Sequence, residues 1–521
     1  MKIVSAQEMR RIEAECDKQG ITSVMLMENA GRAVAEAVRH ILGHVSGKKI
    51  VVLAGPGNNG GDGLVAARYL HDWGAGVGLY LCAQRPADDS NLKLALERSI
   101  ALIEAEKDEN LAGLDSLLNP AEAVIDAVFG TGQSRPISGI YQRVLTRVAE
   151  VKRARPTLKV VALDLPSGLN ADSGAADPVT LFADYTVTLG LPKRGLYTPS
   201  GAGRAGEVVL ADIGIPPELT HNLTTELITS AWARSVLPRR SVVAHKGSFG
   251  KVLVVAGSIN YVGAAYLAAS GAMRVGAGLV TLATARSLQP ILASKLVETT
   301  YLPLPEAAPG IIASSASRMV LAALKDYDVL LMGSGLGPSV PVKEFILRVL
   351  SGMKEPAGMV LDADVLNTLA GKSNWWQRLP FDAILTPHPG EMARLCRLTA
   401  EEVQADRIGL ALKKAAEWGK TVVLKGAYTV IAAPDGRCRV SPAANAGLAS
   451  AGTGDVLAGI ISGLLAQGMS LFDAASLGVY LQAEAAEAVR NRLGDAGMIA
   501  SDLLPELPLV IKGLKEGKVS L

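Results

Sequence analysis

The chain has 521 residues, of which 49% are hydrophobic and only 4% aromatic, and its 54 glycines suit tightly packed sheets and helices. The net charge is only +2 and no polybasic block occurs, which argues against nucleic acid or an anionic membrane as a main partner. Four cysteines without a C-x-x-C pair, and no apolar run long enough to span a membrane, predict a soluble cytoplasmic protein without a zinc or disulfide framework.

The first predicted elements are two helices within residues 5–42, broken near Gly20, which would cover a sheet or a partner subunit. Short apolar runs then recur with glycine or turn residues at their ends, as in "KKIVVLAGPGNNGGDG" and "LKVVALDLPSG". Amphipathic stretches lie between several of these runs. Continuous β-branched runs separated by helical patterns predict a parallel sheet covered on both faces.

Prolines and polar residues then loosen the pattern, and they predict a boundary near residue 225 between domains 1–224 and 225–521. A second α/β series starts at "GKVLVVAGS". Within it, residues 421–441 predict an antiparallel hairpin around "PDG". Ligands of open α/β sheets bind at the carboxyl ends of the strands, so the glycine-rich loops of both halves are the candidate sites.

Polar side chains follow several predicted strands of the first half. The loop "GPGNNGGDG" lacks the lysine and hydroxyl of a phosphate-binding P-loop. Its asparagines could bind phosphate and a cation together, or could serve only a left-handed turn. Singly, each carboxylate could also merely cap a helix. At one sheet edge they would form an oxygen-rich pocket suited to a hard cation and an acid/base pair, made of Asn58, Asn59, Asp126, Asp164, Ser167 and Lys193.

The stretch "NAGLASAGTGDVLAGIISGLLAQG" (445–468) predicts a glycine loop that opens an apolar helix, in which Gly459 and Gly463 allow close packing. Free backbone amides at the positive end of the helix dipole favour a phosphate. Asp455 is then either a general base aimed at a nearby hydroxyl or a favourable charge at the helix start. Lys425 suits a nucleotide phosphate or is a solvated lysine. His388, held between two prolines, is a ligand or a capping side chain.

The motifs "KGSFGKVLVVAGS", "MGSGLG", "LDADVLN", "LTPHPGEMARL", "VVLKGAYTVI" and "AGTGDVLAGI" occur in an order that resembles the ADP/ATP-dependent NAD(P)H-hydrate dehydratases. The resemblance covers residues 225–510 and implies a three-layer ribokinase-like domain that uses ADP and Mg²⁺. It implies that Asp455 helps the ring hydroxyl of the hydrate to attack the terminal phosphoryl group, after which phosphate is eliminated. The implied nucleotide contacts are Lys425, Gly426, Ala427, Tyr428, Thr429 and Gly454, and the implied hydrate contacts are Ala264, Gly337, His388 and Asp455.

The first half resembles the NAD(P)H-hydrate epimerases through "MENAG", "GPGNNGGDG", "DAVFGTG", "DLPSG" and "LPKRG". This resemblance implies a three-layer Rossmann-like domain, K⁺ ligands at Asn59, Asp126 and Ser167, and proton transfer by Asp164 and Lys193. No contact is transferred to residues 139–159, where the loop length differs. The implied substrate contacts are Asn58, Asn59, Gly60, Gly61, Asp62, Gly130, Thr131, Gly132, Gln133, Ser134, Arg135, Pro136 and Asp164.

Together the two resemblances imply one bifunctional, homo-oligomeric repair enzyme that acts on small molecules. The first domain would interconvert the R and S hydrates of NADH and NADPH, and the second would dehydrate the S form with ADP. The alternative interpretation is a second domain that is a small-alcohol kinase, beside a first domain that only binds.

Overall fold

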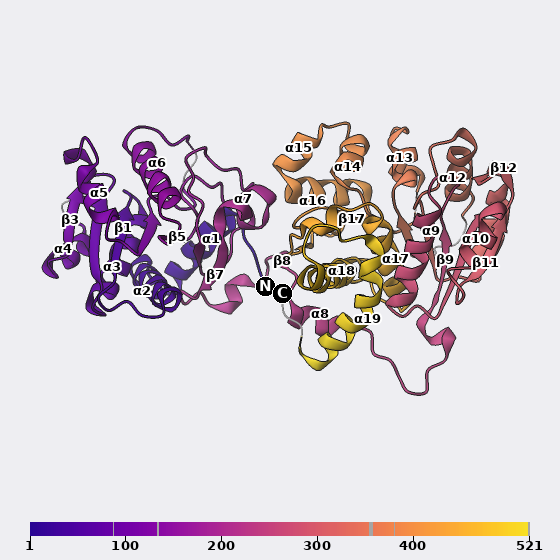
Figure 1. The fold of residues 1–521 in the computed structure, drawn as a ribbon, viewed down its shortest axis with the longest axis horizontal. Helices are drawn as coiled ribbons and strands as arrows, with labels where there is room; N and C mark the ends of the chain where they lie inside the picture. The colour runs from indigo at the N-terminus through magenta and orange to yellow at the C-terminus, as the bar shows by residue number, and fades with distance from the viewer. Residues whose placement is uncertain (87, 133–134, 354–357, 380, 519–521) are drawn as a thin grey trace. The chain divides into compact units, whose positions relative to one another are not determined.

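The structure, a computed structural model, describes residues 1–86, 88–132, 135–353, 358–379 and 381–518. Its chain divides into two compact units, Lys2–Leu223 and Thr224–Leu521, the latter including Met1. Each unit contains a largely parallel sheet with helices around it (Figure 1). The predicted α/β class is therefore confirmed for both halves.

The N-terminal unit contains a seven-stranded sheet in the order β3-β2-β1-β4-β5-β6-β7, and every neighbouring pair in it is parallel. The order reverses between β1 and β4, as in doubly wound dinucleotide-binding folds. The elements are α1 (Ala6–Lys18), α2 (Ser23–Leu42), β1 (Lys49–Ala54), α3 (Asn58–Asp72), β2 (Gly76–Leu81), α4 (Ser90–Glu97), β3 (Ala101–Glu104), α5 (Ala112–Leu118), β4 (Ala123–Ala127), α6 (Gly139–Ala154), β5 (Lys159–Leu163), β6 (Tyr185–Leu189), α7 (Pro199–Ala205) and β7 (Glu207–Ala211).

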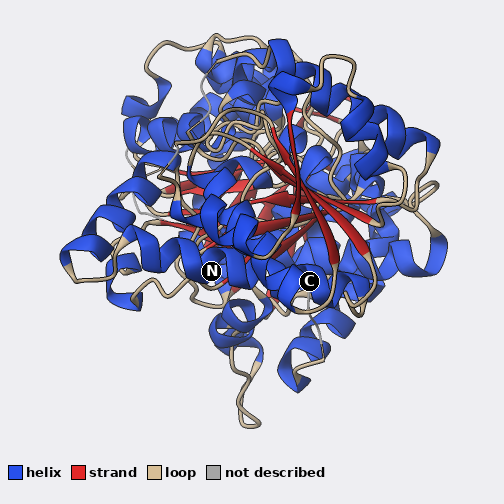
Figure 2. Ribbon diagram, turned by 90° about the vertical axis from the view of Figure 1, so that its left-hand side faces the viewer, coloured by secondary structure: helices blue, strands red, loops and turns tan. Residues whose placement is uncertain are grey.

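Strand β1 explains why this sheet needs helices on both faces. Its side chains alternate, so that Ile50 and Val52 pack with α1, α2 and α3, whereas Val51 and Leu53 pack with α5 and α6. Both clusters are fully buried, which is why the strand reads as a continuous apolar run. Figure 2 shows the strands (red) enclosed by helices (blue).

The C-terminal unit contains a ten-stranded sheet in the order β11-β10-β9-β14-β15-β16-β17-β18-β19-β8. Strands β17, β18 and β19 pair antiparallel, as the hairpin pattern predicted, and β8 joins β19 in parallel at the edge. The strands are β8 (Thr225–Leu227), β9 (Lys251–Val255), β10 (Leu279–Ala285), β11 (Thr300–Leu304), β12 (Glu306–Ala308), β13 (Ile311–Ile312), β14 (Val329–Met332), β15 (Gly358–Leu361), β16 (Ala383–Leu385), β17 (Thr421–Leu424), β18 (Val430–Ala432) and β19 (Cys438–Val440).

The helices of this unit connect and cover the strands. They are α8 (Ser230–Val236), α9 (Val262–Arg274), α10 (Gln289–Ala293), α11 (Ser317–Leu324), α12 (Val340–Gly352), α13 (Asp364–Ala370), α14 (Pro389–Cys396), α15 (Ala400–Ala405), α16 (Arg407–Trp418), α17 (Thr453–Ala466), α18 (Leu471–Leu493) and α19 (Ala500–Glu516). No helix in the described part of the chain combines the length and the apolar character needed to cross a membrane.

The helix that follows the "AGTGD" loop packs closely on α9, as the glycine spacing predicted. A Cβ at Gly459 would lie 2.1 Å from the carbonyl oxygen of Ala268, and one at Gly463 would lie 2.6 Å from that of Ala272. Only glycine fits at such a backbone contact, so the two glycines fix the position of α17 and of the loop before it.

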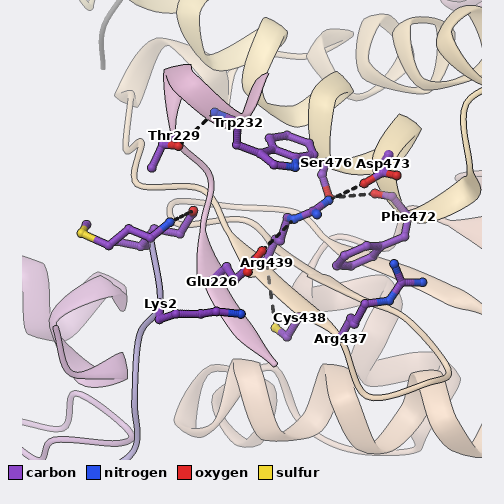
Figure 3. A network of polar contacts seen from close by, with 12 residues as sticks. Lys2, Glu226, Thr229, Trp232, Arg437, Cys438, Arg439, Phe472, Asp473 and Ser476 are labelled. Carbon is purple, nitrogen blue, oxygen red and sulfur yellow. Dashed lines mark hydrogen bonds and ion pairs between the residues drawn. The ribbon is translucent and has the colours of Figure 1, made fainter. Parts of the chain in front are cut away.

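Arg439 of β19 joins three elements at this edge of the sheet (Figure 3). One of its terminal nitrogens donates to Asp473 at 2.7 Å, and its Nε donates to Glu226 of β8 at 3.4 Å. The guanidinium also lies 4.0 Å from the ring centre of Trp232 and 4.5 Å from that of Phe472. The side chain therefore connects β8 and α8 to α18.

We expect Arg439→Met to destabilise the protein by about 2–3 kcal/mol, because it leaves two partly buried carboxylates without their shared cation. Urea unfolding measures this loss. Arg348→Gln is the control, since Arg348 pairs with Glu344 at an exposed site of the same unit and should contribute less than about 1 kcal/mol. Equal losses in the two variants would contradict the assignment.

Candidate functional site

A cavity of about 980 Å³ lies in the N-terminal unit at the carboxyl ends of β1 and β4, where the strand order reverses. Asn58 and Asn59 line it from the first turn of α3, and residues 130–132 line it after β4. Asp164, which follows β5, and Lys193, which follows β6, also reach it. One cavity therefore collects most of the residues that the sequence predicted at separate strand ends.

Asp164 and Lys193 form a buried ion pair in this cavity. The Lys193 side chain is 1% exposed, and its Nζ donates to Asp164 Oδ1 and to the carbonyl oxygen of Leu189. Asp164 has φ +68°, in the left-handed region that non-glycine residues rarely adopt, and its Oδ1 also accepts from the Leu189 amide. The pair therefore presents a carboxylate and an ammonium side by side.

Among the further carboxyl groups that line the same cavity, those of Asp62 and Glu13 have raised pKa values. Burial, together with the charges of Asp164 and Glu13, raises the pKa of Asp62 well above its usual range. Burial also raises the pKa of Glu13 on α1. These groups can hold protons at a pH where ordinary carboxyl groups have lost them.

Asp126, Ser167 and Asn59 lie around the chain that follows β4. Ser167 donates from its hydroxyl to Asp126 Oδ1 at 2.5 Å and from its amide to Oδ2 at 2.9 Å. Asn59 Oδ1 would lie 3.1 Å from a Cβ at Gly130, and Asn59 Nδ2 is buried without a partner in the described part of the chain. The amide, hydroxyl and carboxylate oxygens suit a hard cation.

The other predicted contacts of this half have different positions. Gly60 and Gly61 are not among the described residues that line the cavity. A Cβ at Gly60 would lie 2.0 Å from the Gly55 carbonyl oxygen, so the backbone is closely packed there. Asp62 lines the cavity, whereas Arg135 and Pro136 are not among the described residues that line it. Gln133 and Ser134 lie outside the described residues.

In the C-terminal unit, Lys425 directly follows β17 and is largely buried. Its Nζ donates to Asp362 Oδ1 at 2.8 Å and lies 3.9 Å from Glu391 Oε2. Burial alone would lower the pKa of Lys425, but the charges of Asp362 and Glu391 outweigh it and raise the pKa. Lys425 is therefore a fixed cation and not a solvated lysine.

Asp455 occupies the first turn of α17, whose N-cap Gly452 provides no side-chain cap. A Cβ at Gly454 would lie 3.3 Å from Lys425 Nζ, so the ammonium lies beside the free amides of this turn. Burial, and next the charge of Asp362, raise the pKa of Asp455 to about 6, while Ser334 and Lys425 oppose the rise. Such a pKa suits a general base near neutral pH.

His388 is the N-cap of α14 and accepts a hydrogen bond at Nδ1 from the Gly390 amide. The capping interpretation therefore holds, while Nε2 lies 3.5 Å from Glu391 Oε1. Burial, with help from the Lys425 charge, lowers the pKa of His388 below its usual value. The imidazole is neutral at neutral pH and its half-exposed ring remains accessible to a ligand.

The remaining predicted contacts flank these groups. Ala264 of α9 packs against the turn after β14, since a Cβ at Gly335 in that turn would lie 2.7 Å from the Cβ of Ala264. Gly337, with φ +87°, ends that turn. After Lys425, Gly426 and Ala427 are exposed, and the Thr429 hydroxyl donates to the Gly426 carbonyl oxygen at 2.7 Å. The predicted residues of this half thus gather at the carboxyl ends of β9, β14, β16 and β17.

Two family models match the chain, one in each half. The model described as NAD(P)H-hydrate dehydratase matches residues 252–509, and the one described as YjeF-related protein N-terminus matches residues 23–195. The bifunctional NAD(P)H-hydrate repair enzyme Nnr of Moorella thermoacetica is 42% identical over 525 residues, which cover 99% of this chain and 98% of the relative. The chain belongs to the bifunctional NAD(P)H-hydrate repair enzyme family.

Other members of this repair enzyme family match over almost the whole chain. The relative from Thermofilum pendens is 36% identical over 99% of this chain and 97% of its own, and that from Escherichia coli is 32% identical over 97% and 93%. The resemblances seen in the two halves are confirmed, together with the Rossmann-like and ribokinase-like folds they implied. The kinase alternative is not favoured.

A solved structure also matches the C-terminal half. The ADP/ATP-dependent NAD(P)H-hydrate dehydratase from Bacillus subtilis, co-crystallised with ATP and Mg²⁺, is 33% identical and covers 56% of this chain and 98% of its own, with a TM-score of 0.49.

Some residues at the two candidate sites of this repair enzyme were not predicted from the sequence. Glu13 and Arg10 of α1 line the N-terminal cavity, although the helix was expected only to cover a sheet or a partner. Their spacing along one helix face was the only available signal. Asp362 and Asp364 carried a clearer one, because both follow an apolar strand in "LDADVLN".

Proposed function

We propose that this chain repairs hydrated NADH and NADPH, with epimerisation in residues 1–224 and ADP-dependent dehydration in residues 225–521. The observation that carries the proposal is the 42% identity to a bifunctional repair enzyme over 99% of the chain, which spans both halves. The fusion is chemically sensible, because hydration gives two epimers and the dehydratase consumes one.

In the dehydratase half, Asp455 accepts the proton of the ring hydroxyl as that oxygen attacks the β-phosphoryl group of ADP. The new O–P bond forms as the bond to AMP breaks. The ring nitrogen then expels phosphate by breaking the C–O bond, and loss of a proton from the neighbouring ring carbon restores the dihydropyridine. The Lys425 ammonium and the free amides at the start of α17 stabilise the phosphoryl charge.

The residues of this half are compatible with Mg²⁺ that arrives with the nucleotide. The described residues contain no group of three carboxylate, histidine or cysteine side chains placed to form a metal cage. Mg²⁺ is commonly held mainly by substrate phosphates and water, so the nucleotide bound by residues 425–429 and Gly454 would supply most ligands. Mg²⁺ would neutralise charge on the phosphoryl oxygens.

In the epimerase half, the hydrated carbon carries both the hydroxyl and the ring nitrogen, and it can invert when its C–N bond breaks and forms again on the other face. Opening the ring removes the hydroxyl proton and supplies a proton to the nitrogen, and closure reverses both transfers. The adjacent Asp164 carboxylate and Lys193 ammonium support that exchange, within a cavity large enough for a nucleotide. The oxygens of Asn59, Asp126 and Ser167 would hold K⁺, a cation that neutralises substrate phosphate charge. Within the cavity, the substrate itself would contact Asn58, Asn59, Asp62, residues 130–132 and Asp164.

Product analysis tests the proposal against a small-alcohol kinase. Purified protein supplied with the S hydrate and ADP should release AMP and phosphate and restore the dihydronicotinamide absorbance. A stable phosphorylated hydrate without recovered absorbance would refute dehydration. Repeating the assay with ATP, and with and without K⁺, defines the co-substrate and the cation.

The pKa of Asp455 predicts the pH dependence of dehydration. A base must be unprotonated, so kcat/KM for the S hydrate should rise with pH through about 6 and level off above it. The expected rise is tenfold for each pH unit well below 6. A flat profile between pH 5 and 7 would contradict this role for Asp455.

A cytoplasmic location and a homo-oligomeric state remain predictions that accompany this proposal.

A further inference from the structure

The turn that follows β15 has a strained backbone. It consists of Asp362, Ala363 and Asp364, and Ala363 has φ +46°, a conformation that costs free energy for any residue with a side chain. Gly333 lies directly against it, because a Cβ there would come within 1.9 Å of the Asp362 carbonyl oxygen. Strain of this kind persists where the surrounding structure holds a turn in one conformation.

The turn directs its two carboxylates at different parts of the candidate dehydratase site. Asp362 is 1% exposed, and its Oδ1 accepts from Lys425 Nζ at 2.8 Å and from the Thr386 hydroxyl at 2.7 Å. Asp364 Oδ2 accepts from the amide of Gly337 at 2.8 Å. The Asp362 carboxylate therefore holds Lys425, and the Asp364 carboxylate holds the turn after β14 that contains Gly337.

Lys425 has a choice of carboxylate partners. Asp362 holds its ammonium directly, Glu391 lies at 3.9 Å, and Asp455 attracts it from α17. Lysine has a long flexible side chain and a compact charge, so the strongest contact decides where the ammonium lies. Without Asp362, the ammonium is free to move toward the two carboxylates that remain, Glu391 and the base Asp455.

We propose that Asp362 is a positioning residue, which holds Lys425 against the nucleotide-binding turn of α17 and keeps the lysine from pairing with the base Asp455. This role rests on the proposed function of the C-terminal half. Nothing in the family matches assigns a role to Asp362. Thr386 is part of the arrangement, because its hydroxyl bonds to the same carboxylate oxygen and limits the rotation of the side chain.

The charges around Asp455 give this role a measurable consequence. Asp362 and Asp364 disfavour its ionised form, whereas Lys425 and Ser334 favour it. Glu391 lies 3.9 Å from the Lys425 ammonium, and the charge of Arg394 acts on Glu391 and His388. Removing the Asp362 charge and moving Lys425 onto Asp455 both stabilise the ionised carboxylate. The two effects have the same sign, so the pKa of Asp455 falls.

Asp362→Asn tests the proposal through pH profiles and a split between KM and kcat. We expect the KM for ADP to rise about tenfold, because the cation that faces the phosphate is displaced. We also expect the acid limb of the kcat/KM profile to move to lower pH. An unchanged KM for ADP with the limb at its wild-type pH would overturn the proposal, even if kcat fell.

Two further variants keep the test decisive. Thr386→Val removes one hydrogen bond but keeps the carboxylate, so it should change the same two quantities in the same direction by smaller amounts. If Asp362→Asn does not fold, a Thr386→Val enzyme with wild-type KM and pH profile overturns the proposal. Asp364→Asn lies in the same turn and should raise the KM for the hydrate while leaving that for ADP near wild type.

Failure of this inference is distinguishable from failure of the proposed function. A wild-type protein that does not dehydrate the S hydrate refutes the function itself. An active wild type whose Asp362→Asn and Thr386→Val variants behave identically to it refutes only the positioning role.

Discussion

Asp455→Asn is expected to lower the kcat for dehydration by about 10²–10⁴-fold while ADP still binds with near wild-type affinity. Asparagine keeps the size and hydrogen-bonding geometry of the side chain but cannot accept the hydroxyl proton. Lys425 and the amides of α17, which face the phosphate, are unchanged. Turnover with saturating ADP and calorimetric titration of ADP measure the two quantities separately.

The alternative role for Asp455 is that of a favourable charge at the start of a helix. The stability of Asp455→Asn distinguishes this role from that of a base. The folded-state pKa of about 6 lies above the usual value, so the stability this carboxyl contributes is present at acidic pH and is lost as pH rises through 6. Above pH 6, Asp455→Asn should therefore be at least as stable as wild type. A mere helix charge would give a less stable variant with normal kcat.

Asp502→Asn is a matched control for this comparison. Asp502 occupies the same third position of its helix, α19, and accepts a hydrogen bond from the Ile499 amide at 3.0 Å. The loss of its charge at the helix start should cost about 0.3–1 kcal/mol of stability and leave dehydration unchanged.

Asp164→Asn is expected to slow interconversion of the R and S hydrates by about 10²–10⁴-fold, because it removes the carboxylate of the acid/base pair. It should also destabilise the N-terminal unit by about 3–5 kcal/mol, since Lys193 then remains buried without its counter-ion. Chiral chromatography of the hydrates measures the exchange. Dehydration of the S form by the same preparation should be unaffected.

Asp184→Asn separates catalysis from the loss of an ion pair. Asp184 pairs with Lys152 at 2.8 Å, is partly buried in the same unit, and does not line the cavity. It should reduce stability without slowing epimerisation. Unchanged epimerisation in Asp164→Asn would instead favour an N-terminal unit that only binds.

The sequence predicted those features that depend on local patterns. The run "KKIVVLA" became a buried strand because both of its faces pack on helices, and the glycines of "DVLAGIISG" became the contact between α17 and α9. Lys425 and Asp455 could be predicted as site residues from local signals. Lys425 follows a predicted strand, and Asp455 follows the glycines of "AGTGD". Family resemblance then supplied the substrate, which no local pattern contains.

Other features could not be predicted because they depend on contacts between distant segments. Apart from its spacing along one face of the first helix, nothing in the sequence indicates that Glu13 reaches the cavity that Asp62 and Asp164 also line. The strained Ala363, which separates the directions of Asp362 and Asp364, follows from packing against Gly333 and not from its neighbours in sequence. The placement of β8 beside β19 likewise depends on Arg439 and its partners.

Complete conversion of a mixed hydrate is the most direct test of bifunctional repair. Wild-type protein with an equimolar mixture of R and S hydrates and excess ADP should restore all of the dihydronicotinamide absorbance, with the R form disappearing as the S form is consumed. Conversion that stops with the R hydrate intact would contradict epimerisation by the N-terminal unit, and no conversion at all would contradict the account as a whole.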